Sequence, residues 1–175
     1  NKFRVASLAI LMFTFFSCGT DILQETVVSS IGNDYINTAK GFDDAVRAAY
    51  SSQRTFYVTQ LVLTLTEYGT DIYATGADGS YKGFHFYDAQ LQPTVDYLWV
   101  VWDELYKGIN TCNAVISKAA AVTGLSDAVK KIRVGEAKFL RAHYYYILHQ
   151  QFGGLDLRLE PTDAPTKATA RATDA

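Results

Sequence analysis

KKIRVGEAKFLRAHYYYILHQQFGG, residues 130–154, is the stretch that decides the fold of this chain. One set of its residues follows the i, i+3, i+4, i+7 spacing of a single helix face, namely Ala137, Leu140, Tyr144, Ile147, Leu148 and Gln151. A second apolar stripe lies beside it, formed by Phe139, Ala142 and Tyr146. Gly153 and Gly154 end the helix, because glycine adopts positive φ without steric cost. The pattern predicts one long helix at the centre of a helical domain.

This central helix is apolar over so much of its circumference that it predicts neighbours on more than one side. We expect the rings at helical spacing to belong to the core, namely Trp102, Phe139, Tyr144 and Tyr146. The polar end of the sequence, which has no large apolar residue after Leu159, indicates a truncated chain. One of the two stripes should then stay exposed, because the helices that would cover it are not in the sequence.

Length and composition predict a single globular domain. The chain has 175 residues, of which 49% are hydrophobic and 19% charged, and its net charge is −2. This is enough chain for one core and an ordinary balance of residue types. The slightly acidic net charge argues against a nucleic-acid partner, since neutralising phosphates requires a basic surface.

The first residues resemble an export signal. Lys2 and Arg4 begin an apolar run over residues 5–16, which Ser17 and Cys18 follow. The run is shorter than the ~20 residues that a spanning helix needs, and its basic start is typical of a secretory signal peptide. A cysteine at this place is where a bacterial lipoprotein is cleaved and acylated. We therefore predict a lipoprotein signal peptide over residues 1–17 and a lipid anchor on Cys18. An ordinary signal peptide and a core helix are the alternatives.

The next part of the chain predicts an arm, a helix and a loop. Residues 18–40 are polar with scattered apolar residues and indicate an extended N-terminal arm, with Asn37 or Thr38 capping the next helix. Helical spacing predicts one helix over residues 41–67, although its second half is rich in Thr and Val and locally favours a strand. Residues 69–92 contain four glycines and no helical period, so they predict a long ordered loop, in which Asp78 and Gly79 could turn a short hairpin.

Pro93 is expected to open a second long helix. Spacings of four and three residues alternate along it and predict a narrow seam for a partner helix, made of Leu98, Trp102, Leu105, Ile109, Cys112 and Ile116. We expect Cys112 to be buried and unpaired. Gly124 closes this helix and Ser126 caps the central one, which makes an antiparallel helix hairpin of the tetratricopeptide kind.

Motifs of common enzymes and metal sites are absent from the sequence. It has no nucleotide-binding glycine loop and no Gly-x-Ser-x-Gly, and its histidines, His85, His143 and His149, do not have metal-ligand spacing. We predict no catalytic residues, no metal and no cofactor. Several carboxylates surround the loop, and a glycosidase pair among them is not excluded, but acidic residues at loop ends mostly cap helices or face solvent. Glu136 and Arg141 are expected to bind backbone or another helix.

Aromatic residues of the loop and its surroundings are the candidate binding residues. They lack the helical period that would place them in a core, and flat rings beside polar groups are surfaces on which sugar faces stack. The ligand-binding candidates are Tyr73, Tyr81, Phe84, Tyr87 and Trp99.

Several stretches together resemble the SusD/RagB family of nutrient-binding lipoproteins of the Bacteroidetes outer membrane. They are FSC at 16–18, DDAVRAAY at 43–50, WDELYKGINTCNAVI at 102–116, GEAKFLRAHYYY at 135–146, QFGG at 151–154 and EPT at 160–162. Their order is the order of the family, and together they extend over nearly the whole chain.

This resemblance implies a mainly α fold, a right-handed solenoid of tetratricopeptide-like hairpins with one long aromatic-rich loop. The chain would be an N-terminal fragment, with a SusD-like helical domain over residues 41–160 and a truncated polar linker over residues 161–175. The resemblance also implies an acylated cysteine that anchors a surface-exposed protein to the outer membrane. It implies an oligosaccharide ligand, a SusC-like TonB-dependent channel as partner and no enzymatic activity. Two alternatives stay open, a helical scaffold or peptide-binding subunit of an uptake complex and, less favoured, an enzyme acting on polysaccharide.

Overall fold

The computed structural model describes residues 34–77, 79–164 and 169–172. Its elements are, in chain order, η3 (Tyr35–Asn37), α2 (Ala39–Tyr57), α3 (Gln60–Thr66), α4 (Lys82–Phe86), α5 (Asp96–Lys118), η4 (Ala119–Ala121) and α6 (Asp127–Phe152). The described residues contain no β-strand, and isolated bridges join Thr38 to Thr123 and Tyr68 to Tyr73. The predicted mainly α fold class is confirmed, and the solenoid stays a prediction.

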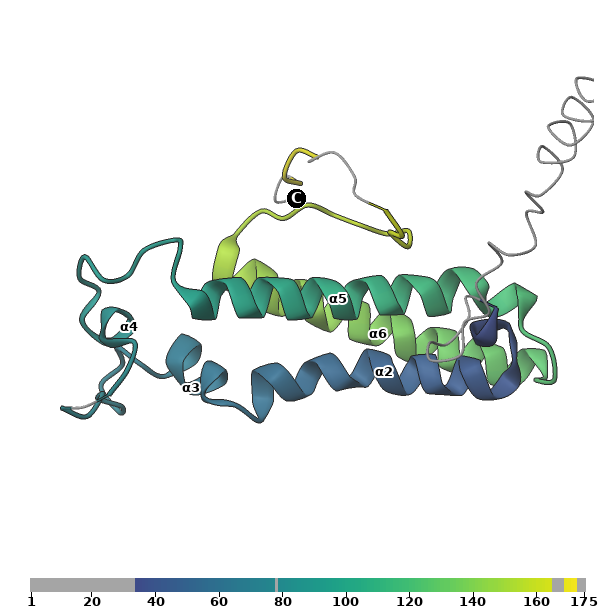
Figure 1. Ribbon diagram of the computed structural model, residues 1–175, viewed down its shortest axis with the longest axis horizontal. Helices are drawn as coiled ribbons and strands as arrows, with labels where there is room; N and C mark the ends of the chain where they lie inside the picture. The colour runs from purple at the N-terminus through teal and green to yellow at the C-terminus, as the bar shows by residue number, and fades with distance from the viewer. Residues whose placement is uncertain (1–33, 78, 165–168, 173–175) are drawn as a thin grey trace, which may run out of the picture. The chain divides into compact units, whose positions relative to one another are not determined.

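Three long helices form the body of the described chain. α5 packs against both α2 and α6, and α2 also contacts α6 (Figure 1). α3 and α4 lie near the end of this bundle where α5 begins, and the residues after α6 return along α5 (Figure 1). The aromatic loop therefore sits at one end of the bundle, next to the first turns of α5 and the last turns of α6.

The prediction of one helix over residues 41–67 was wrong. α2 ends at Tyr57 and α3 begins at Gln60. Between them Thr59 is extended, with φ −108° and ψ 175°, and its hydroxyl accepts a hydrogen bond from the Leu61 backbone N–H at 3.2 Å. A threonine that caps a new helix stabilises this break, because its side chain satisfies a free N–H group there. The predicted cap by Thr38 is confirmed, since its Oγ1 accepts from the Gly41 N–H at 3.0 Å.

α5 begins three residues later than predicted. Pro93 was expected at its first position, but the helix starts at Asp96 and Pro93 lies in the preceding turn, because Val95 is extended, with ψ 131°. The buried residues of α5 are Val101, Leu105, Gly108, Ile109, Cys112, Asn113 and Val115. The centre of the predicted seam is thus correct, while Leu98, Trp102 and Ile116 are half-buried at its margin. The prediction that Gly124 closes this helix was wrong, because α5 ends at Lys118 and η4 follows it, and Gly124 lies beyond η4 with a φ of +79°. The Ser126 hydroxyl caps α6 as predicted.

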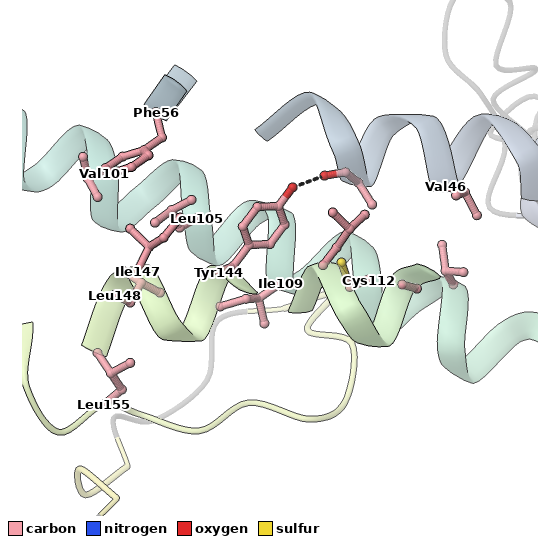
Figure 2. Packing of buried hydrophobic residues seen from close by; sticks show 14 of the residues in the cluster. Val46, Phe56, Val101, Leu105, Ile109, Cys112, Tyr144, Ile147, Leu148 and Leu155 are labelled. Atoms are coloured by element: carbon pink, nitrogen blue, oxygen red, sulfur yellow. Dashed lines mark hydrogen bonds between the residues drawn. The ribbon is translucent and has the colours of Figure 1, made fainter. Parts of the chain in front are cut away.

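The core forms where α6 presents its first stripe to α5 and α2 (Figure 2). Its members Ala137, Leu140, Tyr144, Ile147 and Leu148 are all buried, which confirms that part of the prediction. The Tyr144 hydroxyl donates a hydrogen bond to the Ala49 carbonyl of α2 (Figure 2). Gly108 permits this approach, because a Cβ there would lie 2.7 Å from the Tyr144 ring and 2.9 Å from the Ser52 Cβ. Cys112 is buried and free as predicted, and burial raises the pKa of its thiol to about 12.

The second stripe of α6 is exposed. Phe139 is 68% and Tyr146 61% exposed, so their prediction as core residues was wrong, whereas Tyr144 was correctly assigned. The physical reason is that α5 and α2, the long helices that contact α6, pack on the first stripe and leave the second one uncovered. The expectation that one stripe of this helix stays exposed is confirmed.

Arg141 and Glu136 differ in their partners. The Arg141 side chain of α6 donates a hydrogen bond to the Asn113 side chain of α5 at 2.7 Å, so it binds another helix as expected. Glu136 was expected to reach another element, but its carboxylate accepts from Arg133 of the same helix at 3.1 Å. Arg133 also binds Asp43 of α2 at 2.9 Å, so this half-exposed trio joins the two helices at the surface.

Asn113 of α5 holds the chain that returns after α6. Its amide nitrogen donates to the carbonyls of Arg158 and Glu160, both at 3.1 Å, and its oxygen accepts from Arg141. Asn113 is 1% exposed, so all three of these bonds form around a buried side chain. A buried amide with its hydrogen bonds satisfied fixes the position of the segment that it binds.

Further bonds keep the same segment against the bundle. Leu155 is buried in the core, and Tyr145 Oη both donates to the Arg158 carbonyl at 2.8 Å and accepts from the Arg158 N–H at 2.6 Å. Asn110 pairs with the Thr162 backbone in both directions, at 3.0 Å and 2.7 Å. Residues 155–162, the returning segment, are therefore held along α5 in one position.

Candidate functional site

The aromatic-rich loop contains one short helix and turns. α4 (Lys82–Phe86) interrupts it, and the Gly79 N–H donates to the Gly76 carbonyl at 2.9 Å in the turn where a hairpin was possible. Asp78 lies outside the described residues, and its described neighbours form no strand. The prediction of an ordered loop without helical period therefore missed α4, because five residues are too few to show a helical period.

Two tyrosines with positive φ enclose α4. Tyr81 has a φ of 60° before the helix, and Tyr87 has a φ of 51° after it. This left-handed conformation is unusual for residues with a large side chain and costs energy that the surrounding contacts must offset. The conformation of Tyr87 directs its ring against Gly69, where a Cβ would lie 2.4 Å from a ring carbon. The backbone strain at Tyr87 thus positions one aromatic ring over the end of α3.

A hollow of about 540 Å³ opens where this loop meets the bundle. We call it the aromatic hollow. Its lining comes from α3, the loop around α4, the first turn of α5 and the last turn of α6, and consists of Thr64, Leu65, Tyr68, Phe84, Tyr87, Leu91, Gln92, Pro93, Leu98, Gln151 and Phe152. Large apolar and aromatic walls with a few polar groups are typical of small-molecule binding sites. None of the lining residues is Asp, Glu, His, Lys or Arg.

The structure brings two of the five predicted binding residues into this hollow. Phe84 is 9% exposed and anchors α4 in its wall, while Tyr87 is 68% exposed and lies at its edge. The other three do not line it. Tyr73 and Trp99 are exposed elsewhere, and Tyr81 stacks on Tyr97 with ring centroids 3.6 Å apart. The individual assignments of binding residues remain predictions.

The Tyr81–Tyr97 stack fastens the loop to α5. Tyr97 Oη donates to the Gln60 side chain of α3 at 3.3 Å, so one tyrosine contacts all three elements. Burial, followed by the nearby Tyr81, raises the pKa of Tyr97. This arrangement gives Tyr81 a supporting role in the structure, beside the hollow rather than in it.

Sequence reasoning missed several residues of the hollow. Leu98 and Phe152 were assigned to a helical seam and to a helix end, and both line the hollow from helices that are far apart in the chain. Thr64 was read only as a strand-favouring residue, yet its hydroxyl is buried without a hydrogen-bond partner. Sequence periodicity carries no signal for such a site, because the site forms only when three helices and a loop meet.

The polar groups of the hollow are few. Gln92 donates to the Ala89 carbonyl at 3.1 Å, and Tyr68 Oη accepts weakly from Gln60 at 3.5 Å. Within residues 34–77, 79–164 and 169–172 there is no group of three or more His, Cys, Asp or Glu residues placed to hold a metal ion. In the same part of the chain no helix combines the length and hydropathy needed to span a bilayer. The hollow thus combines apolar and aromatic walls with a few amide and hydroxyl groups.

A comparison with protein families gives one match to this chain. The model of a family described as "Starch-binding associating with outer membrane" matches residues 31–174. This range includes every element described above. The comparisons with curated proteins and with solved structures gave no match.

Proposed function

The chain belongs to the SusD-like family, and from this premise we propose that it is a glycan-binding lipoprotein of the outer membrane that takes part in nutrient uptake. The family binds starch and associates with the outer membrane. The observation that carries the proposal is the aromatic hollow, where Phe84, Tyr87 and Phe152 surround a space of about 540 Å³. Ring faces bind the apolar side of a sugar, and the neighbouring amide and hydroxyl groups bind its hydroxyls.

Binding rather than catalysis fits this site. A glycosidase holds two carboxyl groups about 5 to 9.5 Å apart on either side of the bond that it cleaves. The lining residues of the hollow include no Asp or Glu. We therefore infer that a bound glycan leaves the hollow chemically unchanged.

Affinity electrophoresis of the full chain through gels containing starch, dextran, xylan or pectin tests this function. We expect at least one polysaccharide to retard the chain, and Tyr87→Ala to weaken that retardation about tenfold in affinity, which corresponds to about 1.4 kcal/mol. Phe86→Ala is the matched control, because Phe86 is the exposed neighbour of Tyr87 and does not line the hollow. Migration unaffected by every glycan would contradict the proposed function.

The membrane anchor is a separate part of the proposal. Cys18 lies outside the described residues, and its acylation rests on the sequence pattern of residues 1–18. We expect a palmitate analogue to label the chain in a host that processes bacterial lipoproteins. Cys18→Ala should abolish the label, while Cys112→Ala should keep it, because Cys112 is buried in the core. Labelling that survives Cys18→Ala would disprove the anchor.

A scaffold that docks on a SusC-like TonB-dependent channel is the second candidate function. The observation that favours it is that Tyr73 and Trp99 are exposed outside the hollow, 45% and 64% respectively. If the loop is an interface, Tyr73→Ala and Trp99→Ala should weaken co-purification with the channel, because they remove exposed rings outside the hollow, and should leave sugar binding intact. Loss of sugar binding with unchanged co-purification would favour the glycan site instead.

A further inference from the structure

A second concave surface lies beside the aromatic hollow. It is a groove of about 370 Å³ between α5 and the returning segment, and Trp102, Asp103, Tyr106, Lys107 and Arg158 are among the residues that line it. Its outer wall is the segment that Asn110 and Asn113 hold in place. Because these two amides bind backbone groups, the groove has a fixed shape before any ligand arrives.

The groove and the aromatic hollow are neighbours along two elements. Leu98 lines the hollow and Trp102 lines the groove, and these residues are one helical turn apart on the same side of α5. Phe152 lines the hollow and contacts Trp102 edge-to-face, with ring centroids 5.1 Å apart and an interplanar angle of 89°. A ligand that leaves the hollow over Phe152 therefore meets the indole of Trp102 next.

The charged groups of the groove form ion pairs. Lys107 Nζ lies 2.6 Å from the Asp103 carboxylate and 3.0 Å from the Glu104 carboxylate, and Arg158 Nε lies 2.6 Å from the Asp156 carboxylate. These ion pairs offer both hydrogen-bond donors and hydrogen-bond acceptors. Such edges suit the hydroxyl groups of an uncharged sugar, and a ring face for stacking is supplied by Trp102.

Resting on the proposed function, we propose that the groove is a second sugar subsite, and that hollow and groove together bind one linear, neutral oligosaccharide. The contact between Trp102 and Phe152 joins the two subsites. The hollow holds one end of the ligand, and Lys107 and Asp103 bind hydroxyls of units farther along it. The proposal therefore requires that affinity grow with the length of the sugar.

Isothermal titration of the full chain with maltose, maltotetraose and maltoheptaose tests the proposal. We expect maltoheptaose to bind about tenfold or more tightly than maltose, the effect of one or two additional hydrogen bonds. Lys107→Ala should remove most of this gain without changing the affinity for maltose, whereas Tyr87→Ala should weaken both sugars. Lys40→Ala is the matched control, because Lys40 forms the same kind of exposed i, i+4 bridge, with Asp44, away from both sites.

The outcomes separate this proposal from the one on which it rests. Equal affinities for the three sugars, or a gain with length that survives Lys107→Ala, would overturn the second subsite and leave glycan binding in the hollow intact. If the chain binds none of the three sugars, both the second subsite and a starch-type ligand are contradicted. The electrophoretic retardation by the other polysaccharides then decides whether glycan binding itself fails.

Discussion

Asn113→Ala is expected to release the returning segment from the bundle. The substitution removes two neutral hydrogen bonds, to the carbonyls of Arg158 and Glu160, and one charge-assisted bond from Arg141. Neutral bonds contribute about 1 kcal/mol each and a bond to a charged group about 1.5 to 3 kcal/mol. Since Arg141 keeps its bond to the Leu159 carbonyl, we expect a loss of about 3 to 4 kcal/mol in the free energy of unfolding.

Urea unfolding followed by circular dichroism at 222 nm measures this loss. The midpoint of thermal unfolding should fall by roughly 10 °C for a chain of this size. In this variant, backbone amides of residues 155–162 should exchange hydrogen faster than those of α2, because the returning segment detaches before the helix bundle unfolds. Thr111→Ala is the matched control, since its hydroxyl bonds only within α5, to the Lys107 carbonyl at 3.0 Å.

A loss below about 1 kcal/mol for Asn113→Ala would refute the reasoning, because it would mean that three bonds around a buried amide contribute no more than one. An equal effect of Thr111→Ala would refute it too, since the loss would then reflect α5 itself rather than the segment.

Three further outcomes are expected. Thr64→Val should raise the free energy of unfolding by about 1 kcal/mol, because it replaces an unpaired buried hydroxyl with a methyl group of the same shape, and urea unfolding measures it. Gly108→Val should lower the thermal midpoint strongly, because even its Cβ would lie 2.7 Å from the Tyr144 ring, and a wild-type midpoint would contradict this packing. Stability should fall as pH rises from 10 to 12, because burial raises the pKa of Tyr106 from 10.0 to about 12, so folding favours its neutral form below pH 10 and loses that advantage as the folded protein ionises. Absorbance at 295 nm should show that part of the tyrosine ionisation is delayed to the same pH range.

Local sequence signals correctly located the N-terminal caps of α2 and α6 and the C-terminal end of α6. Thr38 and Ser126 cap α2 and α6 because hydroxyl side chains satisfy free N–H groups wherever they precede a helix. Gly153 ends α6 with a φ of +69°, which other residues rarely adopt. The break at Thr59 was missed because no glycine or proline marks it, and the late start of α5 was missed because Pro93 was expected at its first position.

The binding surfaces were only partly predictable. Phe84 and Tyr87 were predictable as lining residues, because aromatic residues without a helical period are not explained by core packing and indicate a binding surface. The sequence assigns Leu98 and Trp102 to a packing seam, because on a single helix a residue at the edge of the core and a residue that lines a site have the same spacing. The returning segment was uninterpretable from sequence, since its partners are side chains of two other helices.

The sequence by itself determined a mainly α chain, the central helix of residues 130–154 with its glycine stop, and membership of a glycan-binding family through motifs in the right order. These properties depend on neighbours in the chain, where turn geometry and periodicity act. Only the tertiary structure decided that Tyr144 is buried while Phe139 and Tyr146 face outward, and that α3, the loop, α5 and α6 enclose a hollow. The physical reason is that burial and the formation of a hollow depend on which faces of elements distant in the chain pack together. Helical periodicity indicates which face of a helix is apolar, but not which element packs on that face.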